Sequence, residues 1–195
     1  MSEGHPFHKT IRNMIRENGL DEEYEIREDP ACVIESRFHG KKKMLPLYRK
    51  FDSDLLGHKD SHPIDVCWVD MIIKKRDDNR VPIVIEIDES GTSPHHICGK
   101  FLTTAMAEYY DDGVTQYPLL PNTLFIQVVK IKASEDSKSQ MIRKWMALEN
   151  FIQANIQFKD SKKARYMLFW NFDDKLRNQN EYDFIESIRS HMKSI

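Results

Sequence analysis

The stretch PIDVCWVDMIIKKRDDNRVPIVIEIDE, residues 63–89, constrains the fold more than any other part of the chain. Its apolar runs predict two adjacent β-strands, one over about residues 64–73 and one over residues 81–88. The polar KKRDDNR between them is typical of a turn, so a hairpin is the simplest connection. The chain is therefore expected to contain an apolar sheet.

Acidic residues lie at the ends of these strands. Alternate side chains of a strand share a face, so Glu86 and Asp88 are expected to point the same way, and Asp65 can lie beside them if the strands pair. Crowded carboxylates repel one another and are costly to bury, and a hard divalent cation such as Mg²⁺ resolves both problems. The alternative is that these acids lie in water at a strand end and bind nothing.

The pattern of Pro63 and Asp65, followed by Glu86 and Asp88 after an apolar strand and then by a helix, resembles the PD-(D/E)XK nuclease superfamily. The resemblance covers roughly residues 5–130. It implies a restriction-endonuclease-like fold that cleaves DNA with Mg²⁺, for which Mn²⁺ could substitute. The chain departs from the family at Asp88, where a lysine is usual. Some members place this lysine on the next helix.

The resemblance implies catalytic roles for the residues that match the motif. Asp65 and Glu86 would ligate the metal, and Asp88 would be a ligand or would orient water. Lys100, on the following helix, is the candidate to replace the missing lysine. Periodicity favours a surface lysine instead, because an apolar face that includes Leu102 and Met106 leaves Lys100 pointing away from the core.

Positive charge is concentrated between residues 39 and 62, which precede Asp65. Clusters of this kind bind phosphate backbones, although a charge run is also common on a solvated surface. His95 is a further candidate for phosphate contact, because it lies in the first turn of a predicted helix. The candidate nucleic-acid-binding residues in the cluster are Lys41, Lys42, Lys43, Arg49, Lys50 and Lys59.

Periodicity along the rest of the chain predicts an α/β domain with a mixed central sheet flanked by helices. Helices are expected over residues 5–18, 94–110, 137–157 and 179–193, with further strands over residues 123–131 and 165–172. The 195 residues fit one domain, with a nuclease-like core at about 5–130 and a C-terminal strand and helices in 137–195.

Composition and missing motifs narrow the class of protein. No apolar run approaches the roughly 20 residues that cross a membrane, and the N-terminal sequence has no hydrophobic signal region. Cys32, Cys67 and Cys98 lack paired metal spacing, which favours free thiols in the cytoplasm. No GxxxxGK[ST] or GxGxxG sequence is present, so no nucleotide cofactor is expected.

The sequence therefore favours an Mg²⁺-dependent DNA endonuclease, with DNA as its partner and a homodimer as a further possibility. Two other functions stay open. The absent lysine is compatible with a nucleic-acid-binding or protein-interaction module that keeps the fold without cleavage. A restriction or phage-defence component that works only as an oligomer or with a partner is the other. The net charge of −2 counts mildly against nucleic acid, because DNA-binding domains are often basic.

Overall fold

The computed structural model describes residues 6–29, 45–50, 63–89, 93–130, 135–156, 165–171 and 178–195. The helices and strands in these residues are α1 Pro6–Glu17, α2 Leu20–Glu23, β1 Glu25–Glu28, β2 Leu45–Lys50, β3 Pro63–Val69, β4 Met71–Lys74, β5 Val81–Asp88, α4 Pro94–Met106, β6 Tyr109–Asp111, β7 Gln116–Lys130, α5 Glu135–Asn155, β8 Arg165–Asn171 and α6 Asn178–Lys193.

Within the described residues, eight strands form one mixed sheet in the order β1-β4-β5-β7-β6-β2-β3, and β8 also pairs with β7. Strand β4 pairs antiparallel with β1 on one side and with β5 on the other. The chain then crosses over through α4 and returns in β7, which runs parallel to β5, and β8 is parallel to β7. The expected mixed sheet with flanking helices is confirmed.

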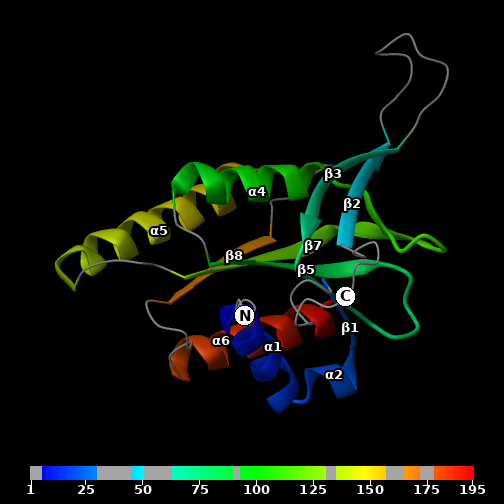
Figure 1. The fold of residues 1–195 in the computed structure, drawn as a ribbon, viewed down its shortest axis with the longest axis horizontal. Helices are drawn as coiled ribbons and strands as arrows, with labels where there is room; N and C mark the ends of the chain where they lie inside the picture. Colours follow the sequence, from blue (N-terminus) through cyan, green and yellow to red (C-terminus); the bar gives the residue numbers. More distant parts are fainter. Residues whose placement is uncertain are drawn as a thin grey trace, which may run out of the picture.

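Helices cover both faces of this sheet (Figure 1). Helices α1 and α6 lie on one face, and α4 and α5 lie on the other. Alternation along β5 divides its side chains between two cores. Ile83, Ile85 and Ile87 belong to the core beneath α1 and α6, whereas Val84 belongs to the core beneath α4 and α5. All eight residues of β5 are buried, so this strand lies at the centre of the fold.

Strands β2, β3 and β6 form an arm at one end of the sheet (Figure 1). The arm joins the centre through β7, whose N-terminal part pairs with β6 and whose C-terminal part pairs with β5 and β8. Between these two parts the β5–β7 register is irregular, because Val81 pairs with Leu119 whereas Ile83 pairs with Leu124. Pro121 lies in this irregular part, where a missing backbone N–H is tolerated.

The four helices predicted from periodicity are confirmed, and the largest difference at an end is in α4, which stops at Met106. The predicted single strand over residues 64–73 is wrong. The chain bends at Asp70, so β3 pairs with β2 in the arm while β4 pairs with β5 in the central sheet. The predicted hairpin therefore joins β4 to β5.

Among the described residues, no helix combines the length and the apolar character that crossing a membrane requires.

Candidate functional site

The two acids of β5 lie on the sheet face beneath α4. Since Ile85 and Ile87 face α1 and α6, the intervening Glu86 and the following Asp88 face the other way, as expected from alternation. Glu86 is 7% exposed and Asp88 is 3% exposed. Buried carboxylates require compensation from neighbouring charge or hydrogen bonds, so the residues around them decide what this site can do.

Lys100 of α4 supplies opposite charge. Its Nζ forms an ion pair with Glu86 Oε1 and lies 3.9 Å from Asp88 Oδ2. The expectation that Lys100 would point away from the core is therefore wrong. Helix α4 has apolar residues on more than one side, and it packs on the sheet through Ile97, Phe101 and Thr104.

The rotation of α4 leaves Leu102 and Met106 exposed, at 47% and 43%. Both residues belonged to the predicted buried face. The packed face lies about a quarter turn away from that prediction, and this places Lys100 beside the acids.

Asp70, at the bend between β3 and β4, is the third acid of the site. Its Oδ2 accepts a hydrogen bond of 2.7 Å from the backbone N–H of Ile87. Its charge also acts on Glu86, whose pKa it raises. Asp70 was not predicted as a site residue, because it lay within a predicted continuous strand.

Asp65 does not take the expected place. It lies on β3, paired with Tyr48 of β2, and its side chain is exposed. Asp65 Oδ2 accepts a hydrogen bond of 2.8 Å from Trp68 Nε1. The bend at Asp70 sends β3 into the arm, and the acids whose charges act most on the pKa of Glu86 are Asp70 and Asp88, in place of the predicted Asp65.

His8 of α1 contacts the end of β5 from the opposite face of the sheet. The ring Nε2 lies 3.1 Å from the carbonyl oxygen of Ile87, to which it can donate, and the backbone N–H donates to Glu89 Oε1 at 2.9 Å. The ring Nδ1 lies 3.7 Å from Asp70 Oδ1. His8 is 7% exposed. The only sequence signal for this residue is its position beside the buried Phe7 in an amphipathic helix.

The charges in this cluster conflict. Burial raises the pKa of Glu86 to about 8, and the charges of Asp70 and Asp88 add to this, while Lys100 opposes it. Burial alone would lower the pKa of Lys100, but Glu86, Asp88 and Asp70 outweigh it and raise that pKa. Glu86 thus retains a proton at a pH where an ordinary carboxyl has lost it.

The donor chemistry of this cluster fits a hard cation. Glu86 Oε2 is buried without a hydrogen-bond partner among the described residues, and carboxylate oxygens are the ligands that Mg²⁺ prefers. Across the same residues, no group of three or more His, Cys, Asp or Glu side chains is arranged to hold a metal ion. As placed here, Glu86, Asp88 and Asp70 do not form such a group, so they could supply ligands to a cation only after Lys100 releases Glu86.

Three of the predicted nucleic-acid-binding residues are described. Arg49 Nη1 donates to the carbonyl oxygen of Met106 at 3.4 Å, and Lys50 Nζ lies 5.7 Å from the centre of the Tyr109 ring. His95 is exposed in the first turn of α4, as predicted. The remaining four, Lys41, Lys42, Lys43 and Lys59, lie outside the described residues.

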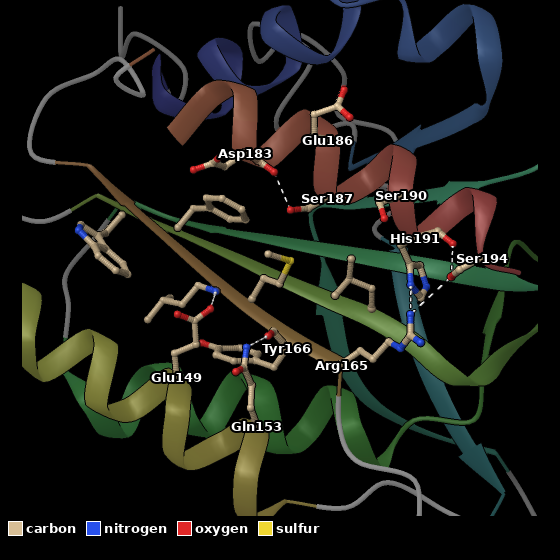
Figure 2. A pocket seen from close by; sticks show the side chains of 15 residues that line it. Glu149, Gln153, Arg165, Tyr166, Asp183, Glu186, Ser187, Ser190, His191 and Ser194 are labelled. Atoms are coloured by element: carbon tan, nitrogen blue, oxygen red, sulfur yellow. Dashed lines mark hydrogen bonds between the residues drawn. The ribbon is translucent and has the colours of Figure 1, made fainter. Parts of the chain in front are cut away.

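A groove of about 990 Å³ lies elsewhere, along β8 between α5 and α6 (Figure 2). Here α5 covers polar backbone groups of β8: Glu149 Oε1 accepts from the N–H of Leu168 at 2.8 Å, and Gln153 Nε2 donates to the carbonyl oxygen of Tyr166 at 2.8 Å. These contacts protect a strand that, within the described residues, pairs with β7 alone. We therefore assign the candidate site to the Glu86 cluster.

The chain was also compared with protein-family models, with curated proteins and with solved structures. No family model matches it, and no match was found among the curated proteins or the solved structures.

Proposed function

We propose that this protein is a metal-dependent nuclease of the restriction-endonuclease-like class that hydrolyses phosphodiester bonds in DNA. One observation carries the proposal: Lys100 lies against the two buried acids Glu86 and Asp88 at the end of a central strand. The resemblance to the PD-(D/E)XK superfamily lacks a lysine at Asp88, and Lys100 supplies an ammonium group to the same carboxylates.

The order of elements supports the same proposal. The chain runs from β4 to β5 as an antiparallel hairpin, then through α4, and then into β7 parallel to β5. An apolar strand that ends in two acids and is followed by a helix is part of the pattern on which the resemblance was based. This order brings the acids of β5 and the lysine of α4 to one place.

Mg²⁺, when bound, lowers the pKa of a coordinated water and offsets the negative charge that develops on a phosphate. Glu86, Asp88 and Asp70 would hold it. The buried Glu86 Oε2, which has no hydrogen-bond partner among the described residues, is the oxygen best suited to a cation.

The chain's own groups would bind the phosphate and position the carboxylates. The Lys100 ammonium carries positive charge at the acids and can attract a phosphate. In the metal-free protein, burial first of all raises the pKa of Glu86 to about 8, so binding a cation there would release a proton near neutral pH. Asp70 is held by the backbone N–H of Ile87, which fixes its distance from the β5 acids.

A second function keeps the fold without cleavage, as a nucleic-acid-binding or protein-interaction module. The ion pair between Lys100 and Glu86 favours it, because ion pairs of this kind also occur with a purely structural role. The two functions differ in whether any divalent ion supports cleavage.

Cleavage of plasmid, duplex, single-stranded and branched DNA, and of RNA, in Mg²⁺ or Mn²⁺ tests the proposal. Glu86→Gln, Asp70→Asn and Lys100→Met should each lower the rate by about 100-fold or more, because each removes a charged group from the site. Asp65→Asn is the matched control and should cleave at the wild-type rate.

Two results would contradict these assignments. Absence of cleavage by the wild type on all of these substrates would leave the binding module as the function. Loss of cleavage in Asp65→Asn, with normal rates in Asp70→Asn, would show that the site uses the acid predicted from the motif.

A further inference from the structure

A buried amide lies beside the candidate site. Gln127 of β7 is fully buried, and its Nε2 has no hydrogen-bond partner among the described residues. Its Oε1 accepts a hydrogen bond of 3.0 Å from the hydroxyl of Tyr166. A buried donor without a partner costs free energy comparable to a lost hydrogen bond, so this amide needs an explanation.

Gln127 is the neighbour of Glu86 across the sheet. The two residues are partners in the parallel register of β5 and β7. Phe125 and Val129, two residues to either side of Gln127, belong to the core beneath α4 and α5, so Gln127 shares the face of Glu86. Two adjacent side chains on one face therefore each carry a buried polar atom that has no hydrogen-bond partner in the described part of the chain, Gln127 Nε2 and Glu86 Oε2.

We propose that Gln127 and Glu86 hold one buried water molecule between Gln127 Nε2 and Glu86 Oε2. Gln127 is then a positioning residue of the site, and Tyr166 fixes its amide.

Geometry and polarity both support a water bridge. Neighbouring strands lie about 4.8 Å apart, and no direct hydrogen bond joins the two atoms. A water that makes two hydrogen bonds of about 2.9 Å spans a gap of this size. Water accepts from an amide N–H and donates to a carboxyl oxygen, so it complements both groups.

Tyr166 determines how the amide is turned. Its ring packs edge-on against Phe101 at 4.9 Å and tilted against Phe125 at 5.9 Å, and the residue is 1% exposed. Burial raises the pKa of its hydroxyl, so the phenol remains a hydrogen-bond donor. With Oε1 of Gln127 held by this donor, Nε2 is directed to the other side of the amide.

The consequence for metal binding rests on the proposed function. A bridge to Oε2 would use one of its two lone pairs, leave the other for the cation and orient the Glu86 carboxyl, in the way that outer groups orient metal ligands in other proteins. Loss of such an outer partner typically weakens metal affinity by about 10- to 100-fold. Gln127→Leu and Tyr166→Phe should therefore weaken Mn²⁺ binding by about 10-fold, measured by calorimetry on folded protein.

The deciding experiment is a metal-free crystal structure of the whole chain at a resolution that reveals ordered water. A water within hydrogen-bond distance of both Gln127 Nε2 and Glu86 Oε2 supports the proposal. Direct contact between the two side chains, or a dry gap, overturns it. Gln127→Leu should lose this water, and its persistence in that variant would also overturn the assignment.

Thr123→Val is the matched control. Thr123 Oγ1 donates to the carbonyl oxygen of Val81 at 2.7 Å, a buried hydrogen bond between the same two strands. This variant should keep both the water and the wild-type Mn²⁺ affinity; equal weakening of affinity by Thr123→Val would mean that Gln127 acts through general stability. Failure of the wild type to bind Mn²⁺ would reject the metal-dependent function. The water bridge would then be decided by the crystal structure alone.

Discussion

Two clusters of charge on the same sheet behave in opposite ways. Around Arg27 of β1, each group is matched: Nε lies 2.7 Å from Glu25 Oε1, Nη1 lies 2.7 Å from Asp112 Oδ2, and Nη2 donates to the hydroxyl of Tyr117 at 2.9 Å. Around Glu86, three acids share the single lysine that the structure places against them among its described residues.

The pKa values of Asp112 and Glu86 shift in opposite directions, which shows the difference between the two clusters. Burial would raise the pKa of Asp112, but hydrogen bonds from the backbone of Thr115 and from Arg27 lower it, so the native state favours the charged form. Burial and Asp70 raise the pKa of Glu86, so the native state there favours the neutral form. The Arg27 cluster therefore stabilises the fold, whereas the charged form of Glu86 destabilises it. Groups that lower stability in this way are typical of functional sites.

The largest effect is expected from a substitution that breaks the Arg27 cluster, which we call the matched cluster. Arg27→Leu should lower the free energy of unfolding by about 3 kcal/mol, because Glu25 and Asp112 lose a partly buried partner. Urea denaturation at neutral pH measures this change. Arg16→Leu removes an arginine that is 51% exposed and pairs with Glu28, and it should cost less than about 0.5 kcal/mol. Equal losses in the two variants would mean that the matched cluster is not special.

A substitution in the Glu86 cluster should instead raise the free energy of unfolding. Between its ordinary pKa of 4.5 and its folded pKa of about 8, Glu86 binds a proton that the unfolded chain has released. The free energy of unfolding of the metal-free protein should therefore fall as pH rises through this window. Glu86→Gln removes the dependence, and at about pH 8 it should be more stable than the wild type by about 2 kcal/mol.

Denaturation with a metal chelator across this pH range measures the difference between Glu86→Gln and the wild type. The difference should vanish below pH 4.5, where both forms carry a neutral side chain. Asp65→Asn changes an exposed acid on β3 and serves as the control. A destabilised Glu86→Gln at high pH would show that the carboxylate is well compensated after all.

A smaller effect at acid pH should mark the matched cluster. Asp112→Asn should cost about 1.5 kcal/mol near pH 7, because it weakens charged hydrogen bonds with Arg27 and Tyr117. The folded pKa of Asp112 lies below its ordinary 3.8, so the wild type loses this stability as pH falls below that value. Thermal melting should therefore find the two proteins converging in strong acid; a constant gap would assign the effect to packing.

The smallest effect concerns the metal. Mg²⁺ at about ten times its dissociation constant should stabilise the wild type by about 1.4 kcal/mol, a rise in Tm of about 3 °C. Glu86→Gln should abolish the rise, and Asp112→Asn, altered in the other cluster, should retain it. If neither Mg²⁺ nor Mn²⁺ changes the Tm of the wild type, the Glu86 cluster does not bind these cations.

The sequence predicted what depends on neighbours along the chain. Alternation is local, so it placed Glu86 and Asp88 on one face, and periodicity located the helices. The choice between Asp65 and Asp70 depended on where a strand breaks, and that follows from the pairing of β3 with β2. This pairing joins segments across a stretch with little apolar pattern, so local reasoning could not find it.

The orientation of Lys100 was predicted wrongly for a different physical reason. The apolar residues of α4 allow more than one face to pack, and contact with the sheet selects Ile97, Phe101 and Thr104. Gln127 gave a weak signal, a single amide within the apolar run TLFIQVVK. It acquires meaning only when the parallel register places it opposite Glu86.

The irregular middle of β7 sets where this chain can change in length. Residues between Leu119 and Leu124 already depart from one-to-one pairing with β5, so an added residue there could be absorbed as a wider bulge. The same addition after Leu124 would exchange Gln127 for its neighbour on the sheet face and turn the amide toward α1 and α6. Natural variants that lengthen this strand should therefore carry their extra residues before Leu124.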